Sequence, residues 1–268
     1  MWKESRSNGV VTATFHSPPM NYFTTIDVLQ LTELVGSWSD PSVRAVVLAG
    51  GVPEKFITHF SAEEILAGLQ DPAGLISNGP VRNERVNSLF RALTDLPKPV
   101  IAALNGDTMG FGFELSLACD FRIGQQGNFR YGLPEIQLGI IPGAGGTQRL
   151  AKLLGTGRAM DLILRPRLLT PEEALSEGLL SMVARDALLS AQELAARLSK
   201  LAPVAVAMVK RSIYHGSDLP LASGLTIETD ASFRAKVAPE ALHWVERYVA
   251  LPLDERRKWL DQERDFEQ

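Results

Sequence analysis

Two glutamates beside glycine-rich turns are the first candidates for chemistry in this chain. Glu114 ends the segment NGDTMGFGFE at residues 105–114, and Glu135 ends the segment YGLPE at residues 131–135. Carboxyl groups from two separate segments can converge on one reacting centre, where the ionised one accepts a proton and the neutral one donates it. The simpler interpretation of Glu114 is that an acidic residue in the first turn of a helix complements the helix dipole.

The first of these segments joins a predicted strand to a predicted helix. An uninterrupted apolar run at residues 99–104 predicts a short buried strand, and residues 113–119 predict a helix that is apolar on most faces. Glycines in such a turn allow the backbone to approach a neighbour closely, and the start of a helix presents unpaired N–H groups. A ligand oxygen that gains negative charge can be stabilised there.

The elements around this turn alternate between strand and helix. Strands are predicted at residues 10–15, 45–49, 120–124 and 128–131, and a helix is predicted at 25–39. Strand, helix and strand in this order predict a right-handed crossover between parallel strands. Residues 66–80 contain repeated Gly and Pro and predict a loop, and the chain beyond residue 203 is predicted to be helical.

A third glycine-rich segment, GIIPGAGGTQRL at residues 139–150, opens another predicted helix. It lacks the Gly-Lys-Ser/Thr ending of a nucleotide phosphate loop. Together, the three segments resemble the signature blocks of the enoyl-CoA hydratase/isomerase (crotonase) superfamily. The resemblance extends from about Gly9 to residues 177–179, and more loosely beyond.

The resemblance implies a fold and an assembly. The fold class is α/β, a spiral of ββα units with two roughly perpendicular sheets and a helical C-terminal part. Residues 1–200 would form the spiral core with the active site, and residues 201–268 a helical region for oligomerisation or capping. Relatives form trimers that often pair, so a homotrimer or homohexamer is expected.

The resemblance also assigns an oxyanion hole to the backbone N–H groups of Phe60 and Phe111. Three side chains depart from the usual pattern: His59 and Phe111 stand where glycine is usual, and Ser61 where aspartate is usual. His59 either takes part in catalysis, since histidine titrates near neutral pH, or fills space and caps a turn. Phe111 either reshapes the acyl pocket or points into the core together with Phe113.

The remaining substrate-pocket residues follow from the same blocks. The resemblance places His59, Ser61, Gly110, Gly112, Pro134 and Gly143 in the substrate pocket, and it assigns the variable residues 66–80 to the wall of the acyl pocket. Glu114 and Glu135 match both positions where hydratases of the superfamily carry glutamates.

The predicted activity is therefore that of an enoyl-CoA hydratase, a hydro-lyase that adds water reversibly to a 2-enoyl-CoA thioester through an oxyanion-stabilised enolate. Two alternatives stay open. One is another enolate reaction on an acyl-CoA, such as double-bond isomerisation or C–C cleavage, and the other is a non-catalytic acyl-CoA-binding protein. The sequence does not assign the acid and base roles to one glutamate or the other.

Composition limits the other possibilities. With 45% hydrophobic and 22% charged residues and a net charge of −4, the chain is typical of a globular protein, and its charge gives no support for nucleic-acid or anionic-membrane binding. The single cysteine, Cys119, lies in an apolar run and fits a reducing, cytoplasmic location. Metal-ligand spacings, signal patterns and membrane-spanning runs are not found. The acyl-CoA thioester is the expected partner, and no cofactor is expected apart from the coenzyme A that the substrate carries.

Overall fold

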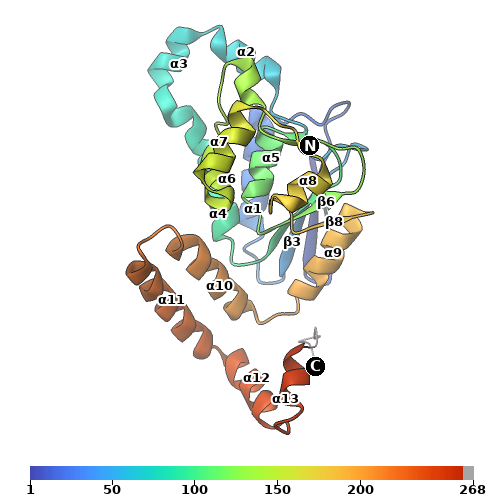
Figure 1. The fold of residues 1–268 in the computed structure, drawn as a ribbon, viewed down its shortest axis with the longest axis vertical. Helices are drawn as coiled ribbons and strands as arrows, with labels where there is room; N and C mark the ends of the chain where they lie inside the picture. The colour runs from blue at the N-terminus through green and yellow to red at the C-terminus, as the bar shows by residue number, and fades with distance from the viewer. Residues whose placement is uncertain (262–268) are drawn as a thin grey trace.

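The computed structural model describes residues 1–261, without the side chains of Val81 and Arg82. Within this range the chain folds around a six-stranded sheet that helices cover on both faces, and a second, two-stranded sheet lies beside it (Figure 1). The large sheet consists, in spatial order, of β1 (Trp2–Ser7), β2 (Val10–Phe15), β3 (Ala45–Gly50), β4 (Val100–Leu104), β6 (Phe121–Gln125) and β8 (Met182–Ala184). The small sheet pairs β5 (Thr108–Met109) with β7 (Tyr131–Gly132) in parallel.

The sheet begins with an antiparallel hairpin that the sequence analysis did not predict. β1 and β2 are joined by Asn8 and Gly9, which both have positive φ, at 47° and 76°. Two consecutive residues with positive φ form the turn type that matches the twist of a hairpin, and Asn-Gly is its preferred sequence. All later pairings in the large sheet are parallel.

The inner strands are buried on both faces, as their uninterrupted apolar runs predict. Every residue of β3 and of β4 is buried. On one face, Ala187, Ala191 and Ala195 of α9 pack against the sheet, and small side chains at this spacing let the helix approach closely. The other face packs against the main core, to which α1, α4 and α5 contribute. The helices of this part are α1 (Thr25–Ser37), α4 (Glu84–Asp95), α5 (Phe111–Leu117), α6 (Gly146–Leu154), α7 (Thr156–Leu164), α8 (Pro171–Ser176) and α9 (Ala187–Leu198).

The chain runs through the two sheets in repeated ββα turns, which confirms the predicted fold class. One turn consists of β4, β5 and α5, and the next consists of β6, β7, a short 3-10 helix (Glu135–Leu138) and α6. The strand predicted at residues 128–131 was misplaced, because pairing with β5 involves only Tyr131 and Gly132. In each turn, one of the two glutamates lies in the helical segment that directly follows the strand of the small sheet.

The loop predicted at residues 66–80 is wrong, since this stretch forms helices α2 (Ala62–Leu69) and α3 (Pro72–Asn78) and the start of a 3-10 helix (Gly79–Asn83). Ser61 caps α2 by accepting a hydrogen bond from the Glu64 amide, and Asp71 caps α3 ahead of Pro72. Neither helix contains a buried residue. They extend from the top of the molecule as an open hairpin (Figure 1).

The C-terminal part is helical, with α10 (Pro203–Gly216), α11 (Leu221–Lys236), α12 (Pro239–Val249) and α13 (Arg256–Asp261) extending away from the sheet (Figure 1). The Lys210 ammonium of α10 lies 2.8 Å from Asp120 Oδ2 and 2.8 Å from the Lys98 carbonyl oxygen, and the Tyr214 hydroxyl donates to Asp120 Oδ1 at 2.9 Å. These buried contacts fasten α10 to the start of β4 and β6. The domain division at residue 200 stays a prediction. In the described chain no helix combines the length and the hydrophobicity needed to cross a bilayer.

Candidate active site

The start of α5 depends on two glycines. Gly110 has a φ of +51°, and a Cβ there would lie 2.8 Å from Glu135 Oε1. A Cβ at Gly112 would lie 1.9 Å from the Ile57 carbonyl oxygen, so only glycine lets the helix pack so closely against the segment after β3. The Glu114 amide donates to the Gly110 carbonyl at 2.9 Å. The backbone of Glu114 and the carboxyl group of Glu135 therefore both lie next to Gly110.

The carboxyl group of Glu114 is buried and is held by main-chain amides. Its Oε1 accepts hydrogen bonds from Ala144 N at 2.9 Å and Gly146 N at 2.7 Å, and the residue is 2% exposed. Burial raises the pKa of Glu114 above its ordinary value, whereas the two amide bonds and the positive charge of Arg149 oppose that rise. The amides favour the ionised form because they donate to a carboxylate oxygen.

The surroundings of Glu135 differ. Its side chain is half-buried, and its Oε2 is buried without a hydrogen-bond partner in the described chain. Burial, assisted by the negative charge of Glu114, raises the pKa of Glu135 to about 7. The influence of Glu114 on this pKa means that the two carboxyl groups interact electrostatically. Glu135 can therefore be neutral or ionised near neutral pH.

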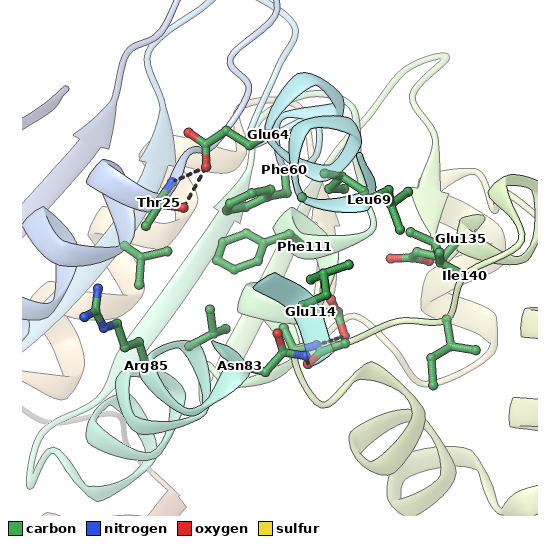
Figure 2. Close-up of a pocket in the computed structure, with 18 of the residues that line it drawn as sticks. Thr25, Phe60, Glu64, Leu69, Asn83, Arg85, Phe111, Glu114, Glu135 and Ile140 are labelled. Carbon is green, nitrogen blue, oxygen red and sulfur yellow. Dashed lines mark hydrogen bonds between the residues drawn. The ribbon is translucent and has the colours of Figure 1, made fainter. Parts of the chain in front are cut away.

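Both glutamates line one cavity of about 650 Å³, a volume typical of a small-molecule site. In Figure 2, the rings of Phe60 and Phe111 lie between the hydrogen-bonded pair Thr25–Glu64 and the two glutamates. The wall consists mainly of apolar groups from α1, α2, α3, α4, α5 and the 139–146 segment: Val28, Ile65, Gly68, Leu69, Leu75, Val86, Ile140, Ile141, Gly143 and Ala144, with Asn78, Asn83 and Arg85 as further polar members.

The backbone amides of Phe60 and Phe111 are free to donate. Neither N–H donates a hydrogen bond to another part of the described chain, and Phe111 is the first residue of α5, where N–H groups have no partner within the helix. Both side chains line the cavity that holds the glutamates. This arrangement is suited to holding an oxyanion, which is the role that the sequence analysis assigned to these amides.

The other predicted pocket residues lie at different distances from the cavity. Gly143 lines it, whereas His59, Ser61, Gly110, Gly112 and Pro134 are not among the described residues of its wall. The His59 ring stacks on Tyr22 at 4.1 Å, and its Nδ1 lies 2.6 Å from the Phe60 carbonyl oxygen. Ser61 caps α2, Pro134 precedes the 3-10 helix that carries Glu135, and the two glycines shape the start of α5.

Comparison with known proteins agrees with this architecture. Residues 5–241 match the family model described as enoyl-CoA hydratase/isomerase. This chain belongs to that family. It is 36% identical over 200 residues to the short-chain-enoyl-CoA hydratase of Clostridium acetobutylicum, covering 72% of each chain. Crystal structures of enoyl-CoA hydratases from Bacillus anthracis (31% identity, 92% of this chain and 95% of that chain, TM-score 0.83) and Geobacillus kaustophilus (26%, 92% and 93%, TM-score 0.86) share its fold.

The groups that hold Glu114 in this enoyl-CoA hydratase/isomerase family member were not predicted from its sequence. The segment at 139–150 was interpreted as a signature block that places Gly143 in the substrate pocket, yet it also donates two amides to a carboxylate of the same chain. Arg149 supports that segment, because its Nη1 donates to the Ala144 carbonyl at 3.0 Å and its guanidinium lies over the Phe90 ring at 5.3 Å. Across residues 1–261, no group of three or more His, Cys, Asp or Glu side chains is arranged to hold a metal ion.

Proposed function

We propose that this protein is an enoyl-CoA hydratase, which adds water reversibly to a 2-enoyl-CoA thioester. The observation that carries the proposal is that Glu114 and Glu135 line one cavity in unequal surroundings. Hydration needs one carboxylate to activate water and one carboxylic acid to deliver a proton. Two glutamates with different environments can supply both roles at one pH.

The surroundings support one assignment of these roles. Burial raises the pKa of Glu114, but its two amide hydrogen bonds and the positive charge of Arg149 stabilise its ionised form, whereas Glu135 Oε2 has no hydrogen-bond partner in the described chain. Glu114 is therefore the proposed base. Glu135, with a pKa raised to about 7, is the proposed acid. Glu114 takes a proton from water as the hydroxyl bonds to the β-carbon, and Glu135 gives its proton to the α-carbon. Transfer of the proton from Glu114 back to Glu135 through solvent restores the starting state.

The thioester oxygen gains negative charge when water attacks the β-carbon. The proposed donors to it are the backbone N–H groups of Phe60 and Phe111, which have no other acceptor in the described chain. Loss of one such donor typically raises the barrier by about 3–4 kcal/mol. Substitution of either side chain leaves its N–H in place, so these donors are tested through substrate analogues rather than through single substitutions.

The proposal includes the acyl-CoA thioester as substrate, with no further cofactor. A homotrimer or homohexamer is the proposed assembly, for which the exposed apolar side chains of the C-terminal helices, such as Phe233, Val237 and Leu242, offer a surface. Light scattering coupled to size exclusion measures the mass of the assembly directly. A cytoplasmic location remains an expectation from the sequence.

The decisive experiment follows the loss of enoyl-thioester absorbance with acyl chains of several lengths and determines the mass of the product. Hydration adds one water molecule, isomerisation leaves the mass unchanged, and C–C cleavage divides the acyl group. Glu114→Gln and Glu135→Gln are each expected to lower kcat by about 10²–10⁴-fold, the usual contribution of general acid–base catalysis. If no chain length is hydrated, or if both variants retain the unmodified protein's rate, the hydratase proposal is wrong.

A further inference from the structure

The side chain of Phe111 forms part of a cluster of aromatic rings beside the glutamates. Its ring stacks on Phe23, with centroids 4.8 Å apart, and contacts Phe60 at 5.6 Å and Phe90 at 5.5 Å. Phe23 and Phe90 are fully buried, and Phe111 is 7% exposed. Because the inner rings are packed in the core, the two that line the cavity, Phe60 and Phe111, form a wall that is difficult to deform.

The neighbouring Phe113 provides a contrast within the same helix. It is 1% exposed, stacks on Tyr131 at 6.5 Å and is not among the residues of the cavity wall. The two alternatives considered for Phe111 therefore each describe part of its surroundings. Phe113 points into the core, whereas Phe111 packs on the core with one side and faces the cavity with the other.

The position of Phe111 determines what an acyl group meets. If the amides of Phe60 and Phe111 hold the thioester oxygen, the acyl group starts beside the rings of the same two residues. The centroids of the two rings are 5.6 Å apart and their planes are inclined by 56°. Because this spacing leaves no room for another group between the rings, an acyl group would lie across their exposed surfaces. Ile65 and Leu69 of α2 and Leu75 of α3 supply aliphatic groups to the same cavity.

This geometry points to a substrate class for the proposed hydratase site: we infer that Phe111 selects 2-enoyl-CoA thioesters whose acyl group is flat and conjugated, such as a 3-aryl-2-enoyl group. The inference rests on the proposed function for its reaction, but its binding preference can be measured without turnover. A flat group gains ring–ring contacts with Phe60 and Phe111 and has few rotatable bonds to immobilise. A saturated alkyl chain gains apolar contact alone and loses more conformational freedom.

The magnitude follows from the energy of aromatic pairs, since one well-placed pair changes a dissociation constant by about 3–10-fold beyond its area. The test uses the double variant Glu114→Gln/Glu135→Gln, which keeps the cavity but cannot exchange protons. Equilibrium titration of this variant with cinnamoyl-CoA and with 2-octenoyl-CoA compares a flat and a flexible acyl group on the same carrier. We expect cinnamoyl-CoA to bind about 3–10-fold more tightly.

A matched pair of substitutions assigns the preference to one ring. Phe111→Leu and Phe113→Leu remove the same atoms from the same helix and keep both backbone amides. In the double-variant background, the first is expected to abolish the preference for cinnamoyl-CoA and the second to retain it. Phe111→Met, which fills irregular gaps, replaces Phe111→Leu if thermal unfolding shows that the leucine variant does not fold.

The outcomes separate the two proposals. Equal or tighter binding of 2-octenoyl-CoA overturns the inference, as does equal loss of preference in the Phe111 and Phe113 variants. If unmodified protein hydrates 2-octenoyl-CoA but binds cinnamoyl-CoA no better, the hydratase proposal stands and the substrate class is wrong. If cinnamoyl-CoA binds preferentially but the unmodified protein hydrates neither thioester, the substrate class stands and the reaction is wrong.

Discussion

Substitution of Glu135 by glutamine should change how the stability of this protein depends on pH. In the folded protein the pKa of Glu135 is raised from the ordinary 4.5 to about 7, mainly by burial. Between these two pH values the folded protein holds a proton that the unfolded chain has released. The contribution of Glu135 to the free energy of unfolding is therefore fully present below pH 4.5. It is lost as the pH rises from 4.5 to about 7, and it does not change further above that pH.

The size of the effect follows from the shift. Each pKa unit corresponds to 1.36 kcal/mol, so the full shift sets an upper limit of about 3 kcal/mol. The half-buried side chain keeps some contact with water, which screens its charge, and we therefore expect about 1–2 kcal/mol. Glutamine cannot ionise and removes this component. The free energy of unfolding of Glu135→Gln, minus that of the unmodified protein, should thus rise by about 1–2 kcal/mol between pH 5 and pH 8.

Urea denaturation at pH 5, 6, 7 and 8, at one fixed protein concentration, measures this difference. Titrating groups that do not interact with Glu135 contribute equally to both proteins and cancel in the subtraction. Glu114 interacts with Glu135, so the same comparison made in a Glu114→Gln background isolates the contribution of Glu135. Glu33→Gln, at an exposed position of α1, is the matched control for replacing a glutamate by glutamine away from the cavity. A difference between Glu135→Gln and the unmodified protein that is constant over this range would refute the reasoning, because it would mean that Glu135 does not bind a proton near neutral pH.

Three further substitutions test other contacts. Glu114→Gln should lower kcat by about 10²–10⁴-fold in the proposed reaction while leaving urea stability unchanged or higher, since it removes a buried charge. Gly112→Ala should destabilise the protein by about 1–3 kcal/mol in urea unfolding, because its Cβ would overlap the Ile57 carbonyl. Lys210→Met should cost about 3–5 kcal/mol, because the buried Asp120 carboxylate loses its cation and keeps only hydrogen-bond donors such as Tyr214, and a double variant that adds Asp120→Asn should recover part of that loss. Equal stability of the two Lys210 variants would contradict the buried-pair argument.

Local sequence signals predicted most of the elements, and several that were missed had a signal. Asn8-Gly9 is a strong hairpin signal, yet β1 was not predicted, since five of its six positions are polar and exposed and show no apolar alternation. The helices α2 and α3 start at Ser61 and at Asp71-Pro72, which are good caps. The recurring Gly68, Gly74 and Gly79 in this stretch favoured the interpretation as a loop.

The site could be predicted less completely, because its key contacts join residues distant in the chain. Glu114 and Glu135 were predicted as site residues from their motifs, but the two amides that hold Glu114 lie 30 and 32 positions later. The orientation of Phe111 depends on Phe23, in the loop before α1, and on Phe90 of α4. Periodicity within one helix cannot distinguish Phe111 from Phe113, since both are buried and only the tertiary packing decides which one meets the cavity.

The hairpin of α2 and α3 gives the cavity one wall of low local stability. Because neither helix has a buried residue, separating this wall from the rest of the molecule exposes little additional apolar surface and should need far less free energy than global unfolding. Amide hydrogens of α2 and α3 should therefore exchange with deuterium long before those of α5. This side of the cavity can then open for the acyl group of the proposed substrate while the start of α5 keeps its geometry.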